Sequence, residues 1–383
     1  MQANKMIYQS HPSFSFKGKK LSIDIDMLNE FEKSYKDYVL DSSGSNLQET
    51  RKKIIVQDLS NKVEKLFKNL IEQSNRENQK HFLEEISENI KRILKYEFSL
   101  SGPDYSKKIA EKNISDVNQK DYFRNKYYIS KFNTMEKICL EIMAFFALVR
   151  PKINVKRGNL KREDLSKNAG LIIFLIKKYL NFLFKKNGTL GLLSEIYGRR
   201  IAVTGLAVEL SVPSSDWWKD KIGASSRPPH TLYCHIDESN RYPKSIVYLS
   251  KVTRDNGPFS VYPGVLEVLK PTHLGNLTGK VIGKIGRKKS SKLFKYFSKS
   301  YHQSMNSENF RKEFSMLPSE IQFNSHFGWD VMPETEIEEF ISSKEVIMEG
   351  ESGTFCIFNG GELLHRGGLA NTGKRVALQV IFG

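Results

Sequence analysis

A change in hydrophobic periodicity divides this chain and limits the folds that it can adopt. From Leu21 to about Lys186, apolar residues recur at steps of three and four, which is the spacing of amphipathic helices. After the turn sequence at 185–191 they alternate singly, as in Ala202–Leu210, and this alternation is typical of strands. The sequence therefore predicts an α+β protein whose helices come first and whose strands follow.

Four stretches of the first half carry the helical pattern most clearly. They are Ile55–Leu70, Phe82–Ile93, Met135–Leu148 and Gly170–Phe184. We expect the third helix to end at Arg150-Pro151, because proline breaks the backbone hydrogen bonding of a helix. The fourth has two lysines in its middle, so we interpret it as a buried amphipathic helix and not as a membrane span. Its alternative is a helix that rests on a membrane surface.

Short runs of strand-forming residues dominate the second half and are separated by turn sequences. Several short strands of this kind favour a sandwich or jelly roll. We expect a mainly helical region at 1–190 that packs on a β domain at 191–383, and a long, basic, partly helical insertion at about 264–344. After the alternating run already described, the predicted strands are Thr231–Asp237, Ser245–Val252, Phe259–Tyr262, Thr354–Phe358 and Arg375–Phe382.

Charge and cysteine content limit the partners and the cellular compartment that we expect. The formal net charge of +17 over 383 residues favours anionic partners, although many of the lysines lie among glutamates, as on an ordinary solvated surface. Three scattered cysteines are too few for a disulfide framework or a zinc ribbon. The first residues also lack the apolar stretch of a secretory signal. We therefore expect a reducing, cytoplasmic setting.

The stretch YCHIDES, residues 233–239, contains the first candidate metal ligands. In a strand His235 and Asp237 would point to the same face, so they could share one ion. A third ligand is available near the C-terminus at His365, and Arg375 follows ten positions later. Two histidines and one carboxylate make the facial triad of non-haem Fe(II) oxygenases. Taken singly, each residue could instead be a solvated polar residue or a buried core histidine.

The order of these motifs resembles a known family. The chain from about Arg200 to Gly383 resembles the phytanoyl-CoA dioxygenase-like branch of the Fe(II)/2-oxoglutarate-dependent oxygenases. The resemblance rests on HID at 235–237, DNGPFSVYPGV at 255–265, and LLHRGG followed by NTGKR at 363–375. It implies a double-stranded β-helix, which is a cupin-like jelly roll, as the core of the domain.

The resemblance also implies the reaction and its site. His235, Asp237 and His365 would bind Fe(II), and Arg375 would bind the 5-carboxylate of 2-oxoglutarate. The enzyme would then be a dioxygenase that uses O₂ to hydroxylate a C–H bond of its substrate. The chain departs from the family at Gly367, where a hydroxyl residue that helps to hold the cosubstrate often stands. Other groups must replace it, and the sequence offers Tyr233, Thr231 and Thr354.

Two neighbouring activities are disfavoured within this superfamily. A halogenase needs a small residue at position 237, where this chain has Asp237. The nucleic-acid-repair branch carries a second arginine six residues after the first, and position 381 is Ile381. Two alternatives of other classes remain open. One is a non-catalytic jelly roll that binds nucleic acid or an acidic membrane surface, and the other is a metal-dependent sugar isomerase.

The segment at 280–299 is the most basic part of the insertion. It contains eight lysines and arginines and no acid, and aromatic residues stand between them. We expect it to cover the mouth of the site and to recognise an anionic group of a small-molecule substrate. The alternative is a solvated loop.

Overall fold

The computed structural model describes residues 20–41, 49–99, 121–122, 124–156, 170–197, 199–213, 230–231, 233–237, 242–269, 271–285, 308–323, 334–368 and 370–383. Within them the chain is a mixture of α-helices and antiparallel sheets, as predicted. It divides into two compact units. The first consists of residues 1–104, 221–238 and 264–344, and the second of residues 105–220, 239–263 and 345–383.

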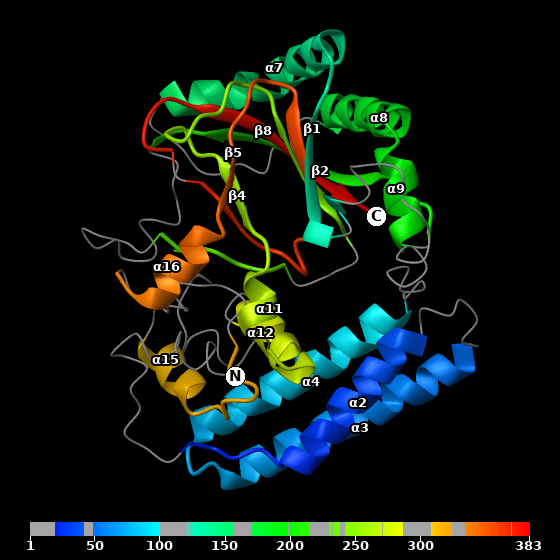
Figure 1. The fold of residues 1–383 in the computed structure, drawn as a ribbon, viewed down its shortest axis with the longest axis vertical. Coiled ribbons are helices and arrows are strands. Elements are labelled where there is room, and N and C mark those ends of the chain that lie inside the picture. The colour runs from blue at the N-terminus through cyan, green and yellow to red at the C-terminus, as the bar shows by residue number, and fades with distance from the viewer. Residues whose placement is uncertain are drawn as a thin grey trace. The chain divides into compact units, whose positions relative to one another are not determined.

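The regular elements in the described part of the first unit are helices, among which α3 and α4 form an antiparallel pair that contacts α2 and α12 (Figure 1). Leu59 and Val63 of α3 are fully buried, as are Phe82 and Ile86 of α4, so the predicted apolar stripes form the core of this unit. Its helices are α2 (Ile25–Asp41), α3 (Glu49–Gln73), α4 (Glu77–Ser99), α11 (Val265–Leu269), α12 (His273–Ile285), α15 (Glu308–Ser315) and α16 (Glu336–Ser343).

The strands in the described part of the second unit form two antiparallel sheets. The larger has the strand order β1-β6-β3-β8-β2, and the smaller has the order β5-β4-β7. Both sheets contribute to one buried cluster, which includes Tyr248 of β3, Val261 of β4 and Cys356 of β6, so one face of each sheet lines this core. The strands are β1 (Tyr127–Lys131), β2 (Val203–Ser211), β3 (Lys244–Tyr248), β4 (Phe259–Tyr262), β5 (Val346–Met348), β6 (Thr354–Phe358), β7 (Leu364–Gly367) and β8 (Arg375–Phe382).

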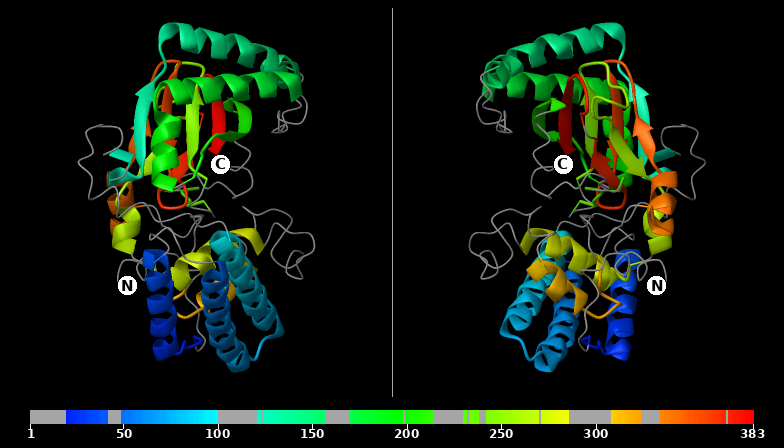
Figure 2. Two further views of the ribbon diagram at one scale, coloured as in Figure 1. Left: turned by 90° about the vertical axis from the view of Figure 1, so that its right-hand side faces the viewer. Right: turned by 90° about the vertical axis from the view of Figure 1, so that its left-hand side faces the viewer.

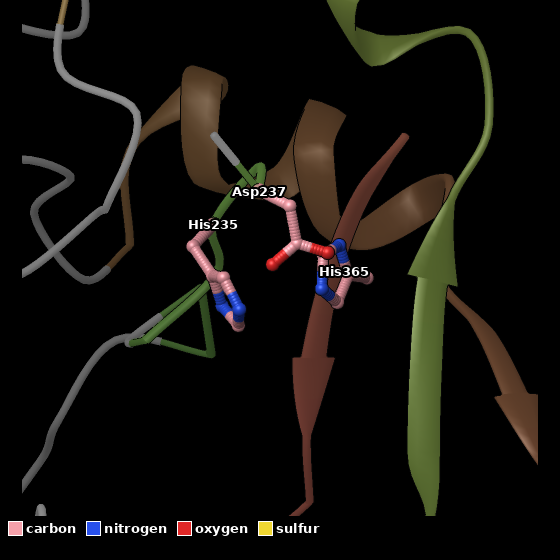
Figure 3. A group of neighbouring side chains, drawn as sticks. All are labelled: His235, Asp237 and His365. Atoms are coloured by element: carbon pink, nitrogen blue, oxygen red, sulfur yellow. The ribbon is translucent and has the colours of Figure 1, made fainter. Parts of the chain in front are cut away.

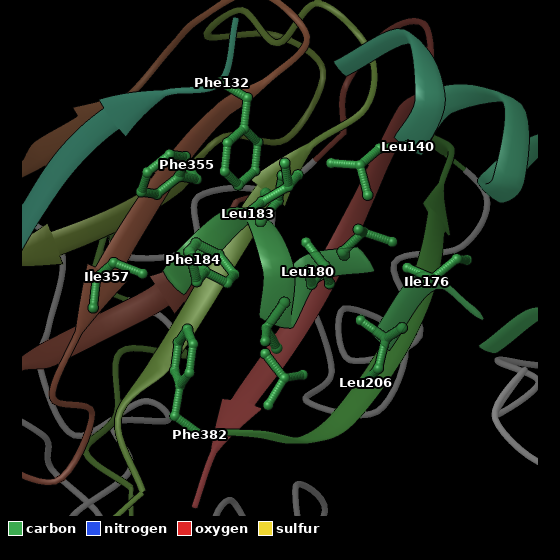
Figure 4. Packing of buried hydrophobic residues seen from close by; sticks show 14 of the residues in the cluster. Phe132, Leu140, Ile176, Leu180, Leu183, Phe184, Leu206, Phe355, Ile357 and Phe382 are labelled. Carbon is green, nitrogen blue, oxygen red and sulfur yellow. The ribbon is translucent and has the colours of Figure 1, made fainter. Parts of the chain in front are cut away.

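Among the described residues of the same unit are the helices α7 (Thr134–Lys156), α8 (Gly170–Lys186) and α9 (Thr189–Tyr197). Leu140 of α7 and Phe184 of α8 share a buried cluster with Phe355 and Phe382 of the larger sheet (Figure 4). These helices therefore cover one face of that sheet (Figure 2). The domain boundary at residue 190 stays a prediction, although α7 and α8 precede it, α9 spans it, and all three share this core with the strands that follow.

Three predicted elements differ from the structure. The strand predicted at Ser245–Val252 is β3, which begins at Lys244 and ends at Tyr248, and Val252 forms only an isolated bridge with Gly350. Thr231–Asp237 is not a strand: its described residues form a turn that is followed by a single bridge residue at His235. A hydrogen bond from the Cys234 amide to the Thr231 carbonyl, 3.0 Å long, closes this turn. The helix α7 does not end at Arg150-Pro151 but continues to Lys156. A proline removes one backbone hydrogen bond, and a helix can continue beyond it.

Candidate metal centre

His235 and Asp237 come from the turn segment, in which His235 is a single bridge residue and not part of a regular strand. Tyr233 has a φ of 69°, which lies in the left-handed region that non-glycine residues rarely adopt. This conformation reverses the chain just before His235, and the Tyr233 ring lies 5.2 Å from the His235 ring between centroids. The two side chains that the sequence assigned to one strand face are thus brought together by a turn.

His365 comes from β7, a short edge strand of the smaller sheet. It stands opposite Val261 of β4 in the antiparallel register. The residue is buried, and its ring lies 5.0 Å from the Phe358 ring and 5.9 Å from the Phe259 ring between centroids. Two aromatic neighbours and the sheet register therefore hold the imidazole in one place.

The structure brings His235, Asp237 and His365 together as a group that could hold a metal ion (Figure 3). One ligand atom of each residue lies within 4.8 Å of the others. His365 is buried, and the other two are partly buried. Two imidazoles and a carboxylate at this separation match the donor set that the sequence predicts for Fe(II).

Hydrogen bonding fixes the direction of both imidazoles. The Nδ1 atom of His235 lies 3.1 Å from the Tyr233 carbonyl oxygen, and the Nδ1 atom of His365 lies 2.9 Å from the Leu363 carbonyl oxygen. A carbonyl oxygen only accepts, so each Nδ1 carries the proton in these contacts. In the neutral rings the lone pair is then on Nε2, which is the atom that can donate to a metal. The donor set therefore fits a divalent ion that is bound through both Nε2 atoms and one Asp237 oxygen.

Arg375 is buried at the start of β8. Its Nη1 donates to the Gly257 carbonyl, and its Nη2 donates to the Ser211 hydroxyl at 3.1 Å. A Glu209 carboxylate oxygen lies 3.9 Å from Nη2, which is beyond hydrogen-bond distance. Within the described residues the buried Nε–H has no partner. A buried guanidinium donor without an acceptor is unfavourable, so this edge of Arg375 is suited to a carboxylate ligand.

The loop after His365 packs against the DNGP turn, whose Gly257 carbonyl accepts a hydrogen bond from Arg375. The amides of Asn371 and Thr372 donate to the Asp255 carbonyl at 2.7 and 3.0 Å. The two backbones also lie very close together at Gly368. A Cβ added at this position would lie 2.0 Å from the Pro258 carbonyl oxygen. The DNGP turn and the loop after His365 therefore pack backbone to backbone, which explains the glycine at position 368.

Comparisons with known proteins give only distant matches. No protein-family model and no curated protein matches this chain. Among solved structures, the non-heme alpha-ketoglutarate-dependent epimerase SnoN from nogalamycin biosynthesis is 13% identical, with a TM-score of 0.36 and coverage of 69% of this chain and 81% of that chain. EctD from S. alaskensis with 2-oxoglutarate and 5-hydroxyectoine is 12% identical, with a TM-score of 0.37 and coverage of 71% and 77%. Similarity at this level establishes neither a shared fold nor a shared activity.

The remaining predicted site residues lie on the turn or at a strand start. Thr231 is fully buried, and its hydroxyl has no hydrogen-bond partner in the described part of the chain. Tyr233 contributes its carbonyl to His235, which is a contact that the sequence did not predict. Thr354 begins β6 opposite Lys131 of β1. Their roles in holding a cosubstrate stay predictions.

Sequence reasoning missed Ser211, the residue that contacts Arg375 with its hydroxyl. Ser211 ends β2 and stands opposite Arg375 in the register of β2 with β8. Ser211 could have been identified by pairing the alternating run at 202–210 with the final strand. The similar length of the two runs is the sequence signal for this pairing. At Gly367, where the family often has a hydroxyl residue, an added Cβ would meet no atom of the described chain within 4 Å. The backbone there does not require glycine.

Proposed function

We propose that this chain is a non-haem Fe(II)- and 2-oxoglutarate-dependent dioxygenase that hydroxylates a C–H bond of an anionic small molecule. The main observation behind this proposal is the group of His235, Asp237 and His365, whose ligand atoms lie within 4.8 Å of one another. Arg375 supports the cosubstrate assignment, because it is buried in the same unit as His365 and has a donor without a partner among the described residues.

The three ligands would leave part of the coordination sphere open. Neutral imidazole and carboxylate ligands on one face of an octahedron suit Fe(II) and leave positions for a cosubstrate and O₂. Bound there with 2-oxoglutarate, the iron would supply the activation of O₂ that C–H oxidation needs. The Tyr233 and Leu363 carbonyls hold the Nδ1 protons of His235 and His365, so both rings keep their Nε2 lone pairs for the ion.

Arg375 would bind the distal carboxylate of 2-oxoglutarate through its Nε and Nη2 edge. Its Nη1 is held by the Gly257 carbonyl, which fixes the plane of the guanidinium before the ligand arrives. The Ser211 hydroxyl, 3.1 Å from Nη2, would take the place of the hydroxyl that is missing at Gly367. A planar pair of parallel donors gives a carboxylate a directed, charge-assisted contact, which a lysine cannot reproduce.

The surroundings of His365 would restrict water. The Phe259 and Phe358 rings lie against the imidazole, and the Tyr248 hydroxyl donates to the Met348 carbonyl at 2.7 Å and accepts from the Phe259 amide at 2.9 Å. Burial raises the pKa of the Tyr248 hydroxyl, so it stays neutral and structural. The Tyr248 hydroxyl therefore positions Phe259 and does not titrate near neutral pH.

The substrate and family assignments belong to the same proposal. The net charge of +17 and the basic stretch at 280–299 support an anionic substrate; most of this stretch lies outside the described residues. We further propose that the two sheets are those of a double-stranded β-helix, and that the chain is a phytanoyl-CoA dioxygenase-like enzyme. The packing of the DNGP turn against the loop after His365 supports this, since these two motifs carried the resemblance.

Succinate formation tests the proposal. The purified chain is supplied anaerobically with Fe(II) and 2-oxoglutarate, exposed to O₂, and screened with acyl thioesters, phosphonates and acidic sugars. We expect succinate release that depends on iron and increases with one substrate class. Substrate conversion without consumption of 2-oxoglutarate would indicate an isomerase and overturn the proposal. Failure to bind Fe(II), measured by anaerobic titration calorimetry, would overturn it as well.

A further inference from the structure

The outer face of α7 is apolar, although it is exposed. The side chains of Met135, Ile142, Phe145 and Phe146 are 54–70% exposed, and Ile138 is 38% exposed. They recur at steps of three and four, opposite the stripe that packs on the larger sheet. A helix that is apolar on both sides is normally covered on both sides.

The neighbouring helix α8 continues this apolar surface. Leu171, Phe174, Leu175 and Phe182 are 47–72% exposed, while the opposite stripe is buried against the sheet. The two helices contact each other and cover the same face of the sheet (Figure 2). Their exposed stripes lie opposite their buried ones, so both point away from the sheet. Together they form one apolar surface, which we call the α7–α8 surface.

The charges on the α7–α8 surface have one sign. Exposed Lys178 and Lys185 stand among the phenylalanines of α8, and Lys178 Nζ lies 5.4 Å from the centre of the Phe174 ring. The helix α8 contains no acid. On α7 the only acids are partly buried: Glu136 pairs with Lys186 at 2.8 Å, and Glu141 accepts a hydrogen bond from Ser352. The surface therefore combines apolar side chains with positive charge.

We propose that the α7–α8 surface docks on an anionic lipid membrane. Helices that lie in a membrane interface place Phe and Leu below the headgroups and carry lysines whose charge stays in the headgroup layer. Among the described residues, none of the helices has the length and hydrophobicity of a membrane span. A second copy of the chain fits less well, because a symmetric contact would bring the same lysines together without an exposed acid to pair with them.

Vesicle sedimentation tests the docking. The full chain is mixed with vesicles of phosphatidylcholine alone and of an equal mixture of phosphatidylcholine and phosphatidylserine. We expect binding to the mixed vesicles that weakens as salt rises. Phe145→Ser/Phe146→Ser should reduce the partition coefficient more than about tenfold, because two apolar side chains no longer enter the lipid. Lys178→Gln/Lys185→Gln should reduce it by roughly fivefold per lysine.

Matched controls come from exposed positions on α3, in the other unit. Ile54 is 63% exposed, and Lys53 and Lys65 are also exposed. Ile54→Ser and Lys53→Gln/Lys65→Gln should leave vesicle binding unchanged, and circular dichroism checks that every variant is folded. Equal binding by the Phe145→Ser/Phe146→Ser variant and the parent would overturn the proposal. So would absence of vesicle binding together with a dimer, seen by analytical ultracentrifugation, that the same variant converts to monomer.

Discussion

The Nδ1 atom of His365 lies 2.9 Å from the carbonyl oxygen of Leu363, two residues earlier in the chain. His235 repeats the arrangement with the carbonyl of Tyr233, at 3.1 Å. The backbone of each segment thus orients its own imidazole. For His365 this segment is the strand β7, and for His235 it is a turn with the left-handed residue Tyr233. In each neutral ring the lone pair is therefore on Nε2 before any ion binds, which lowers the cost of ordering the site.

Loss of any one ligand should therefore weaken metal binding strongly. Removal of groups that only support a ligand costs about 10- to 100-fold in metal affinity, so removal of a ligand itself should cost at least about 100-fold. We expect this for His235→Ala, Asp237→Ala and His365→Ala in anaerobic titrations with Fe(II). His81→Ala, on α4, is the control and should bind Fe(II) like the parent. Near-parental affinity in one of the three ligand variants would remove that residue from the site.

Replacement of Arg375 should weaken the binding of 2-oxoglutarate and leave the binding of Fe(II) unchanged. Arg375→Lys keeps the charge but loses the planar pair of donors, so the affinity for 2-oxoglutarate should fall by about 1–3 kcal/mol. Ser211→Ala removes one neutral hydrogen-bonding group and should cost about 0.5–1.5 kcal/mol. Titration calorimetry with 2-oxoglutarate, at saturating Fe(II), measures both effects.

The control for Arg375→Lys is Arg254→Lys. Arg254 is exposed on a loop of the same unit, and its side chain lies 3.9 Å from Glu349. Its replacement should leave 2-oxoglutarate affinity unchanged. Parental affinity in Arg375→Ala would show that the carboxylate binds elsewhere.

Strands with marked apolar runs between turn residues were predictable from the sequence. Phe259–Tyr262, Thr354–Phe358 and Arg375–Phe382 coincide with β4, β6 and β8, and Val203–Ser211 lies one residue from the predicted run. All residues of β4 and β6 are buried, and short runs of strand-forming residues bounded by turns identified them. The short strand β7 was not predicted, because its four residues include a histidine and an arginine and show no period.

The proximity of His235, Asp237 and His365 was predictable from their motifs, but the way in which they meet was not. His235 and Asp237 meet through a turn and not through the shared face of a strand. Ser211 was missed because its contact with Arg375 depends on the pairing of β2 with β8, which are far apart in the chain. Periodicity reports which face of an element is buried and contains no information on such long-range register.

The close approach at Gly368 should make that position intolerant of a side chain. An added Cβ would lie 2.0 Å from the Pro258 carbonyl oxygen, so the backbone must shift. Gly368→Ala should lower the free energy of unfolding by about 1–3 kcal/mol. Gly367→Ala is the matched control, because its Cβ meets no atom of the described chain within 4 Å, and its effect should stay within about 0.5 kcal/mol. Urea denaturation measures both, and equal stabilities would contradict the packing of the two loops.

Glu345 should make stability depend on pH in the acidic range. Arg366, the residue after His365, donates to its carboxylate at 2.9 Å, and the Tyr262 hydroxyl donates to it at 3.0 Å. Burial alone would raise the pKa of Glu345, but the Arg366 charge and hydrogen bonds from Ser260, Tyr262 and Arg366 outweigh it and hold the pKa below its ordinary value of 4.5. The folded state therefore favours the ionised carboxylate.

A depressed pKa in the folded state stabilises the protein above the unfolded-state pKa, and this contribution is lost as pH falls through the folded-state pKa. At neutral pH Glu345→Gln should thus unfold at lower urea concentration than the parent, since Arg366 loses its charged partner. The difference should shrink as pH falls below about 4.5. Glu351→Gln is the control, because its carboxylate pairs with Lys251 at the surface with 55% of its side chain exposed. This variant should follow the parent at every pH. A difference between Glu345→Gln and the parent that stayed constant down to acidic pH would show that Glu345 acts through packing and not through its charge.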